Sequence, residues 1–423
     1  MTRPDLPGPM RRRGPRPLLL HLWLAILRAT LPTGTPSRAS PNGSPSSKPE
    51  SPNWNAAAQA RMADLTAALA QGRADAFPAA LVTEILRRDD GLIAGIAAYR
   101  RHPWRRDLAD PPAIWSEGET RLLDYGATAP EAAAAPALLV VPSLVNRAHV
   151  LDLTSEQSLL RFLAARGLRP LLLDWGWPGA VERGFTLTDY TAGRLERALH
   201  AATTASGGKV VLAGYCMGGL LALAAATRRP DLLRGLVLLA TPWDFHAPDP
   251  LPARHLAGLL PALEPLMALS AALPVDALQV LFGLLDPWGV ADKYRAFARL
   301  DPNGARAALF VALEDWLNDG VPLAAPVARE CLRDWYGANA PARAAWRVAG
   351  APVDPSGLRL PAFVAVPGRD RIVPPESARP LALRIQGAVL HEPAAGHVGM
   401  VAGSQARAAL WQPLADWLAA LPA

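Results

Sequence analysis

Apolar positions in the middle of the chain form short continuous runs, and segments with helical spacing separate these runs. We expect strands at 136–141, 169–174, 209–213 and 236–240. Helices are expected between them at 155–166 and 189–205. Strands that are apolar on both faces and alternate with helices are typical of a parallel sheet covered on both sides. The pattern therefore predicts a doubly wound, mostly parallel α/β fold.

The first part of the chain shows no such pattern. A basic flank precedes an apolar run at 18–27 that is too short to span a bilayer, and residues 33–53 are rich in Pro, Ser, Gly, Asn and Thr. We interpret residues 1–53 as a disordered leader and linker. A start assigned too early, a surface-associating helix and an export signal are the alternatives.

Residues 54–118 are predicted to be an N-terminal helical segment, with helices at 54–70 and 77–99. Residues 113–126 then alternate around a Glu-Gly turn, which predicts a β-hairpin leading into the sheet. The first part of the α/β core is assigned to residues 119–242.

Residues 243–360 show no parallel-strand signature and contain several helical segments and many of the tryptophans. A segment of this size between two sheet strands is interpreted as a cap, where substrates are selected and water is excluded. Strands resume at 361–367 and 387–392, and a helix is expected at 405–421. Residues 361–423 are therefore assigned to the second part of the core.

One stretch, Gly214-Tyr-Cys-Met-Gly-Gly219, follows the strand at 209–213 and precedes a Leu/Ala-rich helical segment. Glycines remove Cβ atoms where a sharp strand-to-helix turn crowds its neighbours. Cys216 would then stand at the apex, where the first free N–H groups of the helix point at the group under attack. This is the pattern of a nucleophile elbow with sulfur in place of the usual serine oxygen. A glycine-rich turn with a buried structural cysteine is the other interpretation.

Two downstream residues decide between these interpretations. Asp370 follows the strand at 361–367, and His397 follows the strand at 387–392 in a glycine-flanked loop. The carboxyl ends of parallel strands share one edge of a sheet, so both side chains are expected beside Cys216. The order nucleophile, acid, histidine is that of the α/β-hydrolases. The sequence therefore predicts a catalytic triad on an α/β-hydrolase fold with an inserted helical cap.

The predicted roles follow from the chemistry of sulfur. A free thiol has a pKa of about 8.5, so His397 is expected to take its proton and Asp370 to fix the imidazole tautomer. The backbone N–H of Met217 is expected in the oxyanion hole, with a second donor at Leu144 or Val145. Transfer from a thioester to cysteine exchanges one thioester for another, so the acyl-enzyme stays activated towards a hydroxyl acceptor.

Composition narrows the function classes further. Hydrophobic residues make up 51% of the chain and charged residues 19%, which suits a filled core. The net charge of +6 favours anionic partners, but no nucleic-acid motif is present, and nucleic acid is not an expected partner. With only two cysteines, Cys216 and Cys331, a reducing compartment is expected. The spacing of His and Cys residues supports no metal site, and we expect no cofactor.

With these residues in view, the chain resembles the polyhydroxyalkanoate synthases, especially the short class III catalytic subunits. The matching segments are collinear and cover about residues 120–423: Leu144-Val-Asn-Arg147, Leu151-Asp-Leu153, Asp174-Trp-Gly-Trp-Pro-Gly179, Gly214-Tyr-Cys-Met-Gly-Gly219, Thr241-Pro-Trp-Asp-Phe245, Asp315-Trp316, Gly368-Arg-Asp-Arg-Ile-Val-Pro374 and Gly396-His-Val-Gly399. The resemblance implies that a triad of Cys216, Asp370 and His397 polymerises (R)-3-hydroxyacyl-CoA and releases CoA. The residue after the nucleophile is commonly Gln in class III enzymes and is Met217 here.

The resemblance also implies a cytoplasmic enzyme that associates with the polyhydroxyalkanoate granule surface, as a homodimer or with a second synthase subunit. A second hypothesis is a hydrolase with the same triad, acting as a polymer depolymerase or an acyl thioesterase. A third is a granule-binding protein that keeps the fold but has little turnover. A pure binding protein has no use for a complete triad, so we favour an enzyme.

Overall fold

The computed structural model describes residues 12–30, 56–68, 77–129, 132, 135–286 and 288–422. Its centre is an eight-stranded sheet with the strand order β1-β2-β4-β3-β5-β6-β11-β12. The strands are β1 (Ala113–Glu117), β2 (Thr120–Asp124), β3 (Ala137–Val141), β4 (Arg169–Asp174), β5 (Val210–Tyr215), β6 (Leu233–Leu239), β11 (Ala362–Ala365) and β12 (Val389–His391). The pairs β1–β2 and β2–β4 are antiparallel, and all other neighbours in this sheet are parallel. The predicted mostly parallel α/β fold is confirmed.

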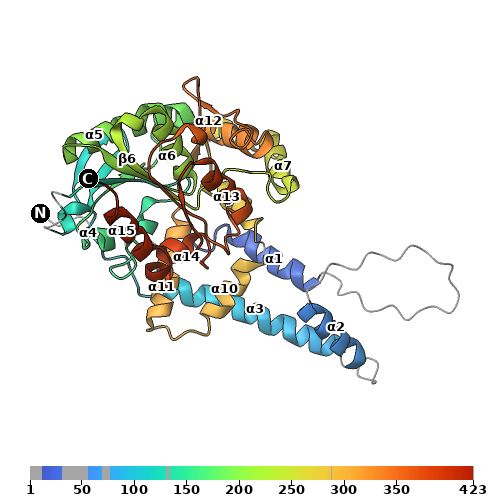
Figure 1. Cartoon of the computed structure of the whole chain (residues 1–423). Coiled ribbons are helices and arrows are strands. Elements are labelled where there is room, and N and C mark those ends of the chain that lie inside the picture. The colour runs from blue at the N-terminus through green and yellow to red at the C-terminus, as the bar shows by residue number, and fades with distance from the viewer. Residues whose placement is uncertain are drawn as a thin grey trace, which may run out of the picture.

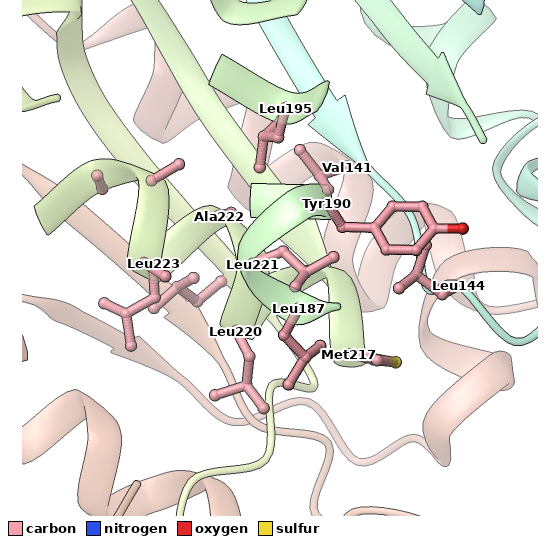
Figure 2. Close-up of a cluster of buried hydrophobic side chains, with 14 of the residues drawn as sticks. Val141, Leu144, Leu187, Tyr190, Leu195, Met217, Leu220, Leu221, Ala222 and Leu223 are labelled. Carbon is pink, nitrogen blue, oxygen red and sulfur yellow. The ribbon is translucent and has the colours of Figure 1, made fainter. Parts of the chain in front are cut away.

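Side chains alternate between the two faces of the sheet, so a separate core forms on each face. In β5, Val210 and Leu212 enter one core together with α5 and α6. Val211 and Ala213 enter the other core together with α4, α14 and α15. Figure 1 shows the two groups of helices on opposite sides of the sheet, and Figure 2 shows the side chains that α6 contributes. The covering helices are α4 (Leu159–Ala164), α5 (Glu196–Ser206), α6 (Met217–Arg228), α13 (Pro375–Arg384), α14 (His397–Ala402) and α15 (Gln412–Ala419).

Between β6 and β11 the chain leaves the sheet and forms a mainly helical layer. This layer lies within residues 243–360, the stretch interpreted as a cap. Its helices are α7 (Pro250–Gly258), α8 (Leu260–Ser270), α9 (Val275–Gly283), α10 (Gly289–Phe297), α11 (Ala305–Asn318) and α12 (Ala325–Glu330). Two pairs of short strands accompany them: β7 (Ala272–Leu273) with β8 (Leu323–Ala324), and β9 (Arg347–Val348) with β10 (Ala351–Pro352). The domain limits drawn from the sequence stay a prediction.

The N-terminal part contains a packed helix where the sequence analysis predicts disorder. The helices here are α1 (Leu18–Thr30), α2 (Ala56–Ala68) and α3 (Phe77–Arg101). Leu22 and Ala25 of α1 share a small core with Tyr294 of α10, and Figure 1 shows α1 near α10. The prediction of a disordered leader is therefore wrong for residues 12–30, because a helix far along the chain covers the apolar side of α1. Other residues of the 1–53 segment lie outside the described ranges.

The hairpin predicted at 113–126 is formed by β1 and β2, with Gly118 in the turn at φ 56°. From the helical segment before it, α3 extends away from the sheet (Figure 1). Among the described residues, no helix combines the length and the apolar character that a membrane span requires.

Candidate active site

Cys216 lies in the turn between β5 and α6. Its backbone has φ 57° and ψ −127°, a conformation that costs a residue with a Cβ about 1–3 kcal/mol. The Cys216 N–H donates to the carbonyl of Leu239 at 2.8 Å, and the Cys216 carbonyl accepts from the N–H of Gly219 at 2.9 Å. These contacts hold the strained turn in place, so the sharp strand-to-helix turn expected from the motif is present.

Two glycines allow α6 to approach the sheet closely at this turn. A Cβ on Gly218 would lie 2.3 Å from the carbonyl oxygen of Val141 at the end of β3. A Cβ on Gly219 would lie 1.9 Å from the hydroxyl oxygen of Thr241, just after β6. No larger residue fits without moving α6, so the glycines fix the position of Cys216 relative to the neighbouring strands.

Asp370 and His397 form a buried hydrogen-bonded pair. His397 is the first residue of α14, and its Nδ1 donates to Oδ2 of Asp370 at 2.6 Å. The other carboxylate oxygen, Oδ1, accepts from the backbone N–H groups of Ile372 at 2.8 Å and Val373 at 2.9 Å. The exposed side-chain fractions are 0% for Asp370 and 7% for His397. The loop after β11 therefore holds the carboxylate, and the carboxylate orients the imidazole.

Electrostatics tie this pair to Cys216. Burial alone would lower the pKa of His397, but the charge of Cys216, the hydrogen bond to Asp370 and a hydrogen bond to Cys216 raise that pKa to about 10. The raised pKa of His397 therefore reports an imidazole in contact with both the Asp370 carboxylate and the Cys216 sulfur. The structure thus places the half-buried Cys216 beside the buried His397 and Asp370.

Tyr215 is a site residue that the sequence analysis missed. Its ring centroid lies 5.2 Å from that of His397, and its hydroxyl donates to the backbone carbonyl of His397 at 3.3 Å. Burial, with the charges of Cys216 and Asp370, raises the pKa of Tyr215 well above its ordinary value, so the hydroxyl stays a donor. The only signal in the sequence was its position beside the nucleophile.

The backbone donors expected in the oxyanion hole come from two segments beside Cys216. Met217 is the first residue of α6, where an N–H has no partner within the helix. Val145 lines the same cavity as Cys216 and Met217, whereas the side chain of Leu144 is buried in the core (Figure 2). The Val145 N–H donates to the Ser143 hydroxyl at 3.2 Å, a contact that a bound oxyanion must share or replace. The second oxyanion donor stays a prediction, with Leu144 and Val145 as its candidates.

Comparison of the sequence with known proteins identifies the family of the chain. The sequence model described as "Alpha/beta hydrolase family" matches residues 138–411. The chain belongs to the alpha/beta hydrolase family. A poly(3-hydroxyalkanoate) polymerase subunit, PhaC, of Haloferax mediterranei is 28% identical over 312 residues, 72% of this chain and 63% of that protein. PhaC of Allochromatium vinosum is 29% identical over 72% of this chain and 87% of that protein. The resemblance seen in the sequence motifs is confirmed.

Similarity to solved structures is weaker. A monoacylglycerol lipase of Paleococcus ferrophilus aligns with a TM-score of 0.43 and 17% identity, over 68% of this chain and 97% of that one.

In this member of the alpha/beta hydrolase family, the elbow opens into a cavity of 330 Å³. Cys216 and Met217 lie in its wall together with side chains of the cap, most of them apolar. The cap residues include Leu256, Leu278, Leu281, Phe282, Leu332 and Trp335. A cavity of about 150 Å³ with apolar walls already holds a benzene molecule, so this one has room for an acyl group. The apolar lining of the cavity suits an apolar acyl chain next to the Cys216 sulfur and disfavours bound water.

Cys331, the second cysteine, also lines this cavity. Burial, with the charges of Glu330 and Asp334, raises the pKa of the Cys331 thiol well above its ordinary value. A thiol held protonated is a poor nucleophile, so Cys216 is the reactive candidate of the two. Within the described ranges, no group of three or more His, Cys, Asp or Glu side chains could hold a metal ion. The expectation that no cofactor is used stays a prediction.

Proposed function

We propose that the chain is an acyltransferase that polymerises (R)-3-hydroxyacyl-CoA into polyhydroxyalkanoate through a Cys216 acyl-enzyme. The observation that carries the proposal is the buried Asp370–His397 pair beside a cysteine that opens into an apolar cavity. Similarity to the polymerase subunits of Haloferax mediterranei and Allochromatium vinosum supports the choice of substrate and product.

In the first step, the Cys216 sulfur, whose proton is held by His397, attacks the carbonyl carbon of the CoA thioester. The oxyanion accepts hydrogen bonds from the N–H of Met217 and from that of Val145 or Leu144. As the bond between the carbonyl carbon and the CoA sulfur breaks, His397 returns a proton to that sulfur. CoA leaves as a thiol, and the acyl group remains on Cys216 as a thioester.

In the second step, a hydroxyl of another hydroxyacyl group gives its proton to His397, and its oxygen attacks the acyl-enzyme carbonyl. The bond to the Cys216 sulfur breaks, and the sulfur is restored with its proton shared with His397. One ester bond is formed for each CoA released. The apolar walls keep the acyl-enzyme away from water, which would otherwise accept the acyl group as free acid.

Hydrolysis by the same triad is the second candidate function, and it differs only in the acceptor. Membership of the alpha/beta hydrolase family supports this candidate. Hydrolysis requires that water reaches the acyl-enzyme. The products formed from one substrate therefore separate the two functions.

The test follows CoA release and product when purified protein is incubated with 3-hydroxybutyryl-CoA. We expect polymer together with free CoA, and loss of both in C216A, because Cys216 is the nucleophile in contact with His397. C331S, at the other cysteine of the cavity, should keep most activity. Free hydroxy acid without polymer would favour the hydrolase, and CoA release that survives in C216A would contradict the assignment of the nucleophile. Binding to polymer without CoA release would favour a granule-binding protein.

We further propose that the enzyme works at the granule surface in the cytoplasm, as a homodimer or with a second synthase subunit. The support is the resemblance to proteins that are named polymerase subunits. Sedimentation of the purified chain with and without substrate reports its oligomeric state, and a fluorescent fusion in polymer-accumulating cells reports its location.

A further inference from the structure

The side chain of Arg12 is buried and makes several hydrogen bonds with distant parts of the chain. Only 6% of its side chain is exposed. Its Nε donates to both carboxylate oxygens of Asp315 in α11, at 2.7 and 3.0 Å. Its two terminal nitrogens donate to the backbone carbonyls of His102 and Trp104. The hydroxyl of Tyr99 donates to the same carboxylate at 2.8 Å, so Asp315 is held from two sides.

The next residue of α11 makes contact with the active-site loop. Trp316 donates from its indole nitrogen to the backbone carbonyl of Arg147 at 2.7 Å. Just after α11, the N–H of Val321 donates to the carbonyl of Val145 at 3.1 Å. The loop that carries the proposed oxyanion donor is therefore attached to α11 and the turn that follows it, and not only to the sheet.

These contacts form a continuous path. Arg12 fixes Asp315, Trp316 is the neighbour of Asp315 in the same helix, and Trp316 holds the segment that contains Val145. Val145 lines the cavity with Cys216. We propose that Arg12 is a positioning residue for acyl transfer, because it fixes α11 and through α11 the oxyanion loop. This inference rests on the proposed function.

The residues after Arg12 strengthen the same attachment. The backbone N–H of Arg16 donates to the side chain of Asn318 at 2.9 Å, at the end of α11. Arg16 also donates from Nε to Asp276 at 2.9 Å, in the first turn of α9. α9 supplies Leu278 and Leu281 to the cavity wall. Residues 12–16 thus bind two cap helices that adjoin the active site.

Loss of the contact between Arg12 and Asp315 should slow oxyanion formation more than it changes the reactivity of the Cys216 sulfur. A displaced 144–145 loop weakens its hydrogen bond to the oxyanion, which forms only in the transition state. The thiolate of Cys216 depends on His397 and not on the oxyanion loop, so its reactivity with an alkylating agent stays the same. A change at Arg12 is therefore expected to lower kcat and leave KM and thiol alkylation nearly unchanged.

The experiment compares the full-length protein with R12A and with R105A as the matched control. In the part of the chain that the structure describes, Arg105 also donates to the carbonyls of His102 and Trp104 but makes no hydrogen bond with Asp315. Acylation of Cys216 is followed with a p-nitrophenyl ester, and its alkylation with iodoacetamide. We expect R12A to acylate about tenfold more slowly with alkylation within twofold, and R105A to resemble the wild type. Thermal unfolding of all proteins is measured alongside.

A second variant, W316F, keeps an aromatic ring at this buried position but removes the hydrogen bond to Arg147, and it should show the same selective loss. It also preserves the test if R12A does not fold. Unchanged acylation in both R12A and W316F would overturn the proposal, as would equal losses of acylation and alkylation. If the wild type acylates with the ester but never forms polymer, the proposed function fails, while the comparison of R12A with R105A still decides the role of Arg12.

Discussion

His397 depends on its neighbours more than any other residue of the site. Because Nδ1 donates to Asp370 at 2.6 Å, Nε2 is the nitrogen that remains for Cys216. Tyr215 holds the backbone carbonyl of the same residue. Asp370 therefore holds the ring and Tyr215 holds the backbone of His397, so the imidazole can pass a proton to and from sulfur without turning. The chemistry at this scale is therefore proton transfer between groups that are already in place.

The raised pKa of His397 gives a prediction for pH. The pKa is raised from an ordinary 6.5 to about 10 in the folded protein. A raised folded-state pKa stabilises the fold fully below pH about 6.5, and this contribution is lost as the pH rises through about 10. An NMR titration should show the His397 ring losing its charge near pH 10. In C216S the largest of the raising causes is removed, so the ring should titrate at lower pH. Titration near pH 6.5 in the wild type would contradict this prediction.

At the scale of elements, the contact between α6 and the end of β3 places the nucleophile. The helix starts immediately after Cys216, and its first turn lies against backbone atoms that cannot move aside independently of the sheet. Geometry at the sulfur is therefore set by helix packing. Stability and activity should be linked at this contact.

G218A tests the contact directly. The added Cβ would lie 2.3 Å from the Val141 oxygen and 2.4 Å from the Pro142 oxygen, so α6 must shift. We expect the free energy of unfolding to fall by about 1–3 kcal/mol, together with a loss of acyl transfer. G208A is the control, because a Cβ there meets no atom within 4 Å, and it should stay within about 0.5 kcal/mol of the wild type. Urea unfolding measures both, and equal stabilities would show that α6 has room to adjust.

At the scale of the whole molecule, the cavity exists only because the cap lies over the elbow. Its walls combine core residues such as Cys216 and Val373 with residues of α7 and α9. Arg371, next to the site carboxylate, pairs with Asp286 of the cap at 2.9 Å. Both partners are well exposed, so this ion pair contributes little stability by itself. Apolar packing of cap against core must keep the two layers together.

L281W should make the cavity smaller from the cap side. We expect kcat/KM to fall about tenfold more for 3-hydroxyoctanoyl-CoA than for 3-hydroxybutyryl-CoA, because the longer chain needs the space that the indole fills. L284W is the control. Leu284 directly follows α9, its side chain is 50% exposed, and it does not line the cavity. Steady-state CoA release with both substrates measures the effect. Equal losses for the two substrates would show that the acyl chain does not occupy this space.

The sequence by itself determined the sheet, the elbow and the order of Cys216, Asp370 and His397. Those features depend on local patterns: apolar runs predict buried strands, glycines predict a crowded turn, and each site residue directly follows a strand. The position of a residue after a parallel strand already assigns it to one edge of the sheet.

Only the tertiary structure decided the role of the N-terminal residues, the contact of Tyr215 with His397 and the shape of the cavity. The ion pair between Arg12 and Asp315 joins positions 303 residues apart, and nothing near either residue indicates the other. For the same reason α1 looked like part of a disordered leader, since the side chains that cover it come from α10. Periodicity reports which face of an element is apolar, but the partner that buries this face is fixed only when distant segments pack together.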